Sequence, residues 1–152
     1  MLKHIPALLT PDALHALASM GHGDELAIVD AHFPAARLAA QGGARLVRTP
    51  GVDAPTLLRA VLTLLPLDDF GPESAWTMQP VPGTGDAAAP PRAVVALQAA
   101  LKDGGERPAA SLERFAFYER ATRAFAIFAS GEQRTYGNLL LRKGVWREAA
   151  GR

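Results

Sequence analysis

The stretch MGHGDELAIVDAHFP, residues 20–34, is the one around which the rest of the chain is organised. Its centre, Leu26–Val29, is a continuous apolar run, which is typical of a strand covered on both faces. His22 stands before this run, and Asp30 and His32 follow it. An extended chain advances at most about 3.6 Å per residue, so the two ends lie too far apart to touch unless the chain bends at the glycines or a second copy supplies the partner. The stretch therefore predicts a buried strand and suggests a site assembled across subunits.

The composition is typical of a single globular domain with room for a hydrophobic core. The 152 residues are 49% apolar and 20% charged, and the formal net charge is +1. Charges of both signs are mixed along the chain, so the pattern indicates no nucleic-acid partner and no membrane partner. The chain has no cysteine, which excludes disulfides, thiolate metal sites and cysteine nucleophiles. Neither a signal-peptide core nor an apolar run of about 18 residues occurs, and we therefore expect a cytoplasmic protein.

Helical and extended patterns alternate along the chain, which predicts an α/β fold with helices layered on a largely parallel sheet. Thr10, Asp53 and Ser111 are each placed to cap the start of a helix. The whole chain is expected to form one domain. Its parts are helices over 11–20, 54–65, 93–102 and 112–123, strands over 26–29, 45–48, 75–80, 124–129 and 139–141, a turn over 33–36, a flexible loop over 80–92 and a C-terminal extension over 146–152.

His22 and Asp30 are candidates for chemistry within the opening stretch. His22 lies between two glycines, where the backbone can present the ring at the edge of a cleft, and histidine is the usual proton carrier near neutral pH. Asp30 ends the strand, where α/β sheets usually hold ligands. A surface histidine and a turn-capping aspartate remain alternatives. His22, Asp24, Asp30 and His32 match no compact metal-ligand spacing, so no metal site is expected.

A second polar cluster lies in the C-terminal third of the chain. Arg114 and Tyr118 fall on one expected helix, and Tyr136 and Asn138 precede the last expected strand. Guanidinium, phenol and amide groups are the donors and acceptors that recognise ligands rich in hydroxyl groups. The cluster therefore indicates a binding site for a small polar molecule.

Four motifs in order carry a resemblance to a known family. They read Gly21-His22-Gly23-Asp24-Glu25, Asp30-Ala31-His32-Phe33-Pro34, Arg114-Phe115-Ala116-Phe117-Tyr118-Glu119-Arg120-Ala121 and Tyr136-Gly137-Asn138. Together they resemble the L-fucose mutarotase branch of the ribose pyranase/fucose mutarotase family. The resemblance covers residues 1–34, the helix after Asp53 and residues 111–145, whereas residues 71–110 match poorly.

This resemblance implies an isomerase that interconverts the α and β anomers of an aldopyranose, most simply L-fucose, without a cofactor. It implies that His22 is the proton donor and that the sugar contacts are Asp30, Arg114, Tyr118, Tyr136, Gly137 and Asn138. It also implies a homo-oligomer, a ring-like decamer with sites near subunit boundaries. A D-ribose pyranase and a non-catalytic monosaccharide-binding accessory of a sugar transport system remain alternatives. A pure binding protein has no need of a titrating histidine at position 22.

Overall fold

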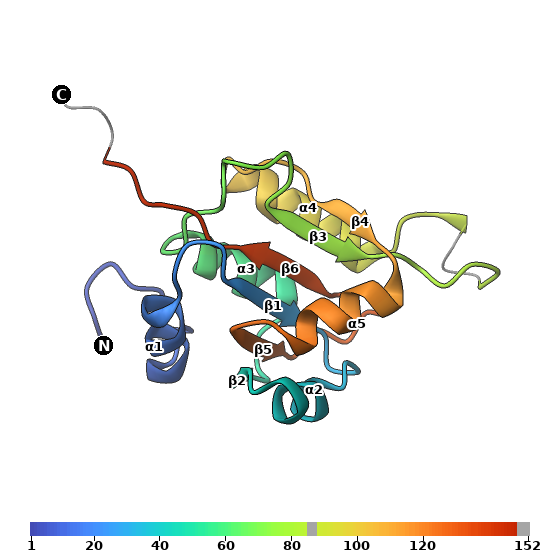
Figure 1. Ribbon diagram of the computed structural model, residues 1–152, viewed down its shortest axis with the longest axis horizontal. Coiled ribbons are helices and arrows are strands. Elements are labelled where there is room, and N and C mark those ends of the chain that lie inside the picture. The colour runs from blue at the N-terminus through green and yellow to red at the C-terminus, as the bar shows by residue number, and fades with distance from the viewer. Residues whose placement is uncertain (85–87, 149–152) are drawn as a thin grey trace.

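The computed structural model describes residues 1–84 and 88–148, which form five helices and one six-stranded sheet (Figure 1). The helices are α1 (Pro11–Ser19), α2 (Ala35–Gly42), α3 (Ala54–Leu62), α4 (Arg92–Asp103) and α5 (Arg114–Thr122). The strands are β1 (Glu25–Val29), β2 (Arg45–Thr49), β3 (Ala75–Met78), β4 (Ala110–Leu112), β5 (Ala126–Ser130) and β6 (Leu139–Arg142). The expected α/β class is confirmed.

The sheet has the strand order β2-β5-β1-β6-β3-β4, and only β6 runs against the other five strands. The predicted largely parallel sheet is therefore confirmed. In the register of β1, Leu26 lies opposite Ala126 of β5 and Leu141 of β6. Because β6 is antiparallel, its first residues lie next to the carboxyl end of β1, at the same end of the sheet as the carboxyl end of β5. This arrangement brings residues that are far apart in the sequence to the end of β1.

Helices cover both faces of the sheet, as Figure 1 shows. Helices α1, α3 and α4 pack with Leu26 and Ile28 of β1 on one face, and α2 and α5 pack with Ala27 and Val29 on the other. Alternate side chains of β1 thus enter two different cores, and all four are fully buried. The prediction that this strand is covered on both faces is confirmed.

Two of the three predicted helix caps are confirmed. Thr10 Oγ1 accepts a hydrogen bond from the N–H of Ala13 at 3.2 Å, and Asp53 Oδ1 accepts one from Thr56 at 2.8 Å. The prediction for Ser111 is wrong, because this residue lies in β4, opposite Thr77 of β3. Glu113 caps α5 instead: its carboxylate accepts hydrogen bonds from the first turn of the helix. Pairing with β3 delays the start of the helix to Arg114.

The turn predicted over 33–36 is also wrong, since α2 begins at Ala35. Three side chains of α2 are buried, those of Ala35, Leu38 and Ala39, and two of these are small. The spacing of apolar residues that would predict a helix is therefore weak in the sequence. Gly42 explains why α2 packs so closely on α5: a Cβ at this position would lie 1.6 Å from the carbonyl oxygen of Thr122. Tertiary contact, more than local sequence, therefore selects the helix.

Parts of the predicted loop over 80–92 and of the predicted extension over 146–152 lie outside the described residues, which omit 85–87 and 149–152. Within the described part of the loop, Thr84 Oγ1 donates a hydrogen bond to the carbonyl of Val81 at 2.7 Å. In residues 1–84 and 88–148, no helix has the length and apolar character needed to cross a membrane.

Candidate functional site

Asp30 is the centre of a buried polar cluster at the carboxyl end of β1, and it is only 4% exposed. Its Oδ1 accepts a hydrogen bond from the N–H of His32 at 3.0 Å, and its Oδ2 accepts one from the N–H of Gly137 at 3.2 Å. Asn138 Nδ2 also donates to Oδ2 at 3.0 Å, and Asn138 Oδ1 accepts from the N–H of Asp30 at 2.9 Å. Asp30, Gly137 and Asn138 therefore form one hydrogen-bonded unit.

The Asp30 carboxyl group has its pKa raised above the ordinary value. Burial is the main cause, and it outweighs the hydrogen bonds from His32, Asn138 and Gly137, which lower the pKa. A carboxylate has about four acceptor sites, and the protein uses three of them. Asp30 thus keeps the capacity to accept one hydrogen bond from a ligand hydroxyl group.

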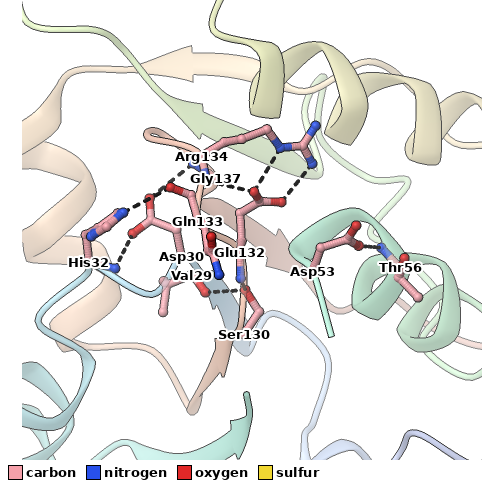
Figure 2. A network of polar contacts seen from close by, with 10 residues as sticks. All are labelled: Val29, Asp30, His32, Asp53, Thr56, Ser130, Glu132, Gln133, Arg134 and Gly137. Carbon is pink, nitrogen blue, oxygen red and sulfur yellow. Dashed lines mark hydrogen bonds and ion pairs between the residues drawn. The ribbon is translucent and has the colours of Figure 1, made fainter. Parts of the chain in front are cut away.

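The turn between β5 and β6 lies beside Asp30, and Figure 2 shows its residues Ser130, Glu132 and Arg134. Glu132 is 2% exposed, and its two carboxylate oxygens accept hydrogen bonds from Arg134 Nε and a terminal guanidinium nitrogen, both at 2.8 Å. The hydrogen bond from Arg134 is the main reason that the pKa of Glu132 is lowered. Ser130 Oγ donates to the carbonyl of Val29 at 2.8 Å, which fastens the turn to the end of β1. The ion pair of Glu132 and Arg134 was not identified from the sequence, because two opposite charges two positions apart in a turn form no recognisable motif.

The backbone at positions 136 and 137 is specialised for this turn. Tyr136 has a φ of 62°, a left-handed conformation that non-glycine residues adopt rarely. At Gly137, a Cβ atom would lie 2.5 Å from Glu132 Cγ and 3.3 Å from Asp30 Cβ. Only glycine therefore lets the N–H of residue 137 approach the Asp30 carboxylate.

Gly137→Ala should lower the free energy of unfolding by about 1–3 kcal/mol, the usual effect of overpacking a buried site. It should also weaken binding of a sugar ligand, because the new methyl group separates the turn from Asp30. Urea unfolding and sugar titration measure the two effects. Gly51→Ala is the matched control, since a Cβ there would meet nothing within 4 Å. Equal stability of both variants would contradict this account of Gly137.

A cavity of about 220 Å³ opens beside the cluster. Its lining residues are Asp30, His32, Phe33, Met78, Val81, Arg114, Tyr118, Thr135, Tyr136 and Asn138. This volume lies below the range of about 300–1,000 Å³ for drug-sized ligands, so it suits a smaller molecule. A wider cleft of about 580 Å³ also reaches Asp30 from the side of α2, but Asp30 is the only predicted sugar contact that lines it.

The walls of the smaller cavity are fixed by packing and by one hydrogen bond. The ring of Tyr118 lies 5.3 Å from that of Phe33, and the hydroxyl oxygen of Tyr136 accepts a hydrogen bond from the N–H of Val81 at 3.1 Å. Arg114, the first residue of α5, also lines the cavity. Five of the six predicted sugar contacts therefore line one cavity, and the sixth, Gly137, lies behind Asp30.

His22 lies apart from these six residues, at the opposite end of β1. The strand alone advances about 16 Å, and His22 lines a different cavity, of about 590 Å³, between α1 and the segment around Val145. Its side chain is 49% exposed. The chain does not bend at the glycines so as to bring His22 and Asp30 together.

The His22 ring is held by two residues that sequence reasoning missed. Its Nε2 lies 3.3 Å from Oδ1 of Asp68, and its ring centroid lies 5.1 Å from that of Phe70. Burial raises the pKa of Asp68, but the hydrogen bonds from Phe70 and His22 outweigh it and hold the pKa below the ordinary value. Because an ionised carboxylate only accepts, we assign a hydrogen atom to Nε2 of His22. Asp68 lies 46 positions from His22, and no local pattern connects them.

Within residues 1–84 and 88–148, no three histidine, aspartate or glutamate side chains are grouped so that they could hold a metal ion. Asp24, which the sequence offered as a possible ligand, instead accepts a hydrogen bond from the N–H of Gly21 at 2.7 Å.

The fold and the site define a class of small α/β proteins. In this class a polar pocket for a hydroxyl-rich ligand lies at the carboxyl ends of strands in a mixed sheet. Residues 3–146 match the model of the RbsD / FucU transport protein family. The chain belongs to this family.

Individual relatives agree with this assignment. The chain is 46% identical over 145 residues to the Homo sapiens fucose mutarotase, with 95% of this chain and 94% of the relative covered. The Streptococcus pneumoniae fucose mutarotase, solved in complex with L-fucose, is 38% identical with a TM-score of 0.86, covering 96% of this chain and all of that one. Bacillus subtilis RbsD, complexed with D-ribose, has a TM-score of 0.72 over 97% of this chain and all of that one; at 19% identity it shows the shared fold alone.

Proposed function

We propose that this protein is an L-fucose mutarotase, an isomerase that accelerates exchange between the α and β anomers of the sugar. One observation carries the proposal: the polar cavity built on Asp30, Asn138 and Tyr118 lies in a chain that is 46% identical to a fucose mutarotase over nearly its whole length. The cavity supplies carboxylate, amide, phenol and guanidinium groups for the sugar hydroxyls.

The chemistry requires only proton transfers. The hemiacetal ring opens when one proton leaves the anomeric hydroxyl and another reaches the ring oxygen, and the aldehyde then closes on its other face. A positioned acid–base group accelerates such a step by about 10²–10⁴-fold. His22 is our candidate for the acid: when its imidazole is protonated, Asp68 holds the Nε2 hydrogen and the Nδ1 hydrogen can pass to the ring oxygen, while a water molecule takes the proton of the anomeric hydroxyl. We expect no metal or nucleotide cofactor.

We further propose that His22 reaches the sugar from a second copy of the chain. Two observations support this composite site: the length of β1 separates His22 from Asp30, and the His22 side chain is half exposed. Exposed apolar side chains surround the neighbouring cavity, among them Leu2 and Trp146, which fits a surface covered by another copy. The decameric assembly and the cytoplasmic location stay predictions.

Anomer exchange followed by NMR at equilibrium, with and without protein, tests the proposed activity. We expect faster exchange of L-fucose that persists in the presence of a chelator. Activity that vanishes with the chelator and returns with a divalent ion would overturn the cofactor-free proposal. Tight sugar binding without faster exchange would instead support a sugar-binding accessory of a transport system.

Arg114→Ala should reduce the preference of the protein for L-fucose over D-ribose. Arg114 lines the cavity, where its guanidinium can donate to hydroxyl groups whose configuration differs between the two sugars. Exchange rates of both sugars, measured on the wild type and the variant, give the preference. Equal acceleration of the two sugars by the wild type, unchanged in Arg114→Ala, would contradict this role.

A further inference from the structure

The irregular segment 68–72, between α3 and β3, carries Asp68 and Phe70, which contact the His22 ring. Asp68 accepts from His22 Nε2, and Phe70 packs against the ring at an interplanar angle of 45°. Asp68 Oδ1 also accepts a hydrogen bond from the N–H of Phe70 at 3.3 Å, which couples the two residues. The orientation of the imidazole ring therefore depends on how this segment is held.

Arg107 holds the segment from a distant part of the chain, the connection between α4 and β4. One terminal nitrogen of its guanidinium donates to the carbonyls of Gly71 at 2.7 Å and Pro72 at 2.9 Å, and the other donates to the carbonyl of Asp68 at 2.6 Å. Among residues 1–84 and 88–148, no other hydrogen bond reaches these three carbonyl oxygens. A planar guanidinium presents its donors in a fixed fork, so a single side chain can set the relative positions of several acceptors.

We propose that Arg107 is a positioning residue for catalysis, which fixes the 68–72 segment and, through Asp68 and Phe70, the orientation of His22. This inference rests on the proposed role of His22 as the proton-transfer group. In the part of the chain that the structure describes, the three hydrogen bonds of the Arg107 guanidinium all go to main-chain oxygens, and Arg107 lines neither the Asp30 cavity nor the His22 cavity, so it acts through other residues.

The main test compares the exchange rate and the sugar affinity of Arg107→Ala with those of the wild type. Small displacements of a catalytic group reduce rates strongly, and we expect the rate at saturating L-fucose to fall about tenfold. The dissociation constant of the sugar should stay within about twofold, because the Asp30 cluster is untouched. The ¹⁵N chemical shifts of the His22 ring should also change, because the Nε2 hydrogen is no longer held by Asp68.

Arg107→Lys separates the geometry of the fork from its charge. Lysine keeps a cation near Asp68 but cannot present the planar fork, so we expect it to restore only part of the rate. Full wild-type behaviour of Arg107→Lys would show that charge alone matters and would overturn the proposal. Should Arg107→Ala fold poorly, this lysine variant carries the comparison of rate and chemical shift.

Arg59→Ala is the matched control, because it removes an arginine whose ion pair, with Asp103, does not involve segment 68–72. That pair is exposed on both sides, and such pairs contribute little. We expect Arg59→Ala to stay within about twofold of the wild type, since surface pairs are weak. Equal rate losses in Arg59→Ala and Arg107→Ala, or no change of rate and His22 shifts in Arg107→Ala, would overturn the proposal. The His22 shifts need no enzymatic activity, so an inactive wild type would refute the proposed function while the shifts still tested the positioning role.

Discussion

His22→Ala should lose most of the anomer exchange while the dissociation constant for L-fucose stays within about tenfold, or ~1.4 kcal/mol. His22 is proposed to move a proton in the transition state, whereas Asp30 and Asn138 hold hydroxyl groups in the ground and transition states alike. Removing the first kind of group lowers turnover, and removing the second weakens binding as well. Anomer exchange by NMR and sugar titration on the same protein measure the two quantities.

A folding defect would not explain this result, because the His22 side chain is half exposed and its turn lies outside both cores. Thermal unfolding of the variant checks that point. Exchange at the wild-type rate in His22→Ala would remove this residue from the mechanism and would favour a protein that only binds the sugar.

Asp30→Asn should weaken sugar binding by more than about tenfold and lower the free energy of unfolding by about 1–3 kcal/mol, the usual penalty for a buried unsatisfied donor. The asparagine amide would bring an NH₂ group to a site where His32, Gly137 and Asn138 already donate. Either orientation of that amide leaves at least one of these donors facing another donor. Sugar titration and urea unfolding provide the measurements.

The same substitution has a pH dependence of known sign. Burial raises the pKa of Asp30 in the folded protein, so the folded state binds this proton more tightly than the unfolded chain. Ionised Asp30 therefore opposes folding above its folded pKa, and this opposition is relieved as the pH falls through that value. As the pH falls from the folded pKa of Asp30 toward the ordinary pKa of the unfolded chain, the difference in unfolding free energy between wild type and Asp30→Asn should move in favour of the wild type. A difference that does not vary with pH would contradict the raised pKa.

Mixing the two variants tests whether the site is shared between copies. A subunit with His22→Ala still provides Asp30, and a subunit with Asp30→Asn still provides His22. After equal amounts of the two variants are unfolded and refolded together, random assembly should restore about a quarter of the wild-type activity if each site uses both subunits. No recovery would contradict the composite site.

Much of the framework could be predicted from local sequence. The apolar run Leu26–Val29 predicts a strand buried on both faces, and Thr10 and Asp53 predict two helix starts, because these signals act within a few residues. The start of α5 could not be predicted in the same way. Ser111 has the chemistry of a cap, but strand pairing with β3 competes for it, and Glu113 takes the role.

The residues of the site also fall into those that the sequence indicated and those that only the tertiary structure brought together. Residue types alone indicated a hydroxyl-binding set that included Arg114, Tyr118 and Asn138, and the family resemblance added Asp30. The length of an extended strand indicated that His22 and Asp30 could meet only if the chain bent at the glycines or a second copy supplied the partner. Only the tertiary structure decided that Asp30 and Asn138, 108 positions apart, share two hydrogen bonds, and that Asp68 is the partner of His22. The antiparallel placement of β6 beside β1 brings the first pair together, and the segment after α3 brings the second. Sequence patterns carry information over a helical turn or a strand, whereas these contacts depend on the order of strands in the sheet.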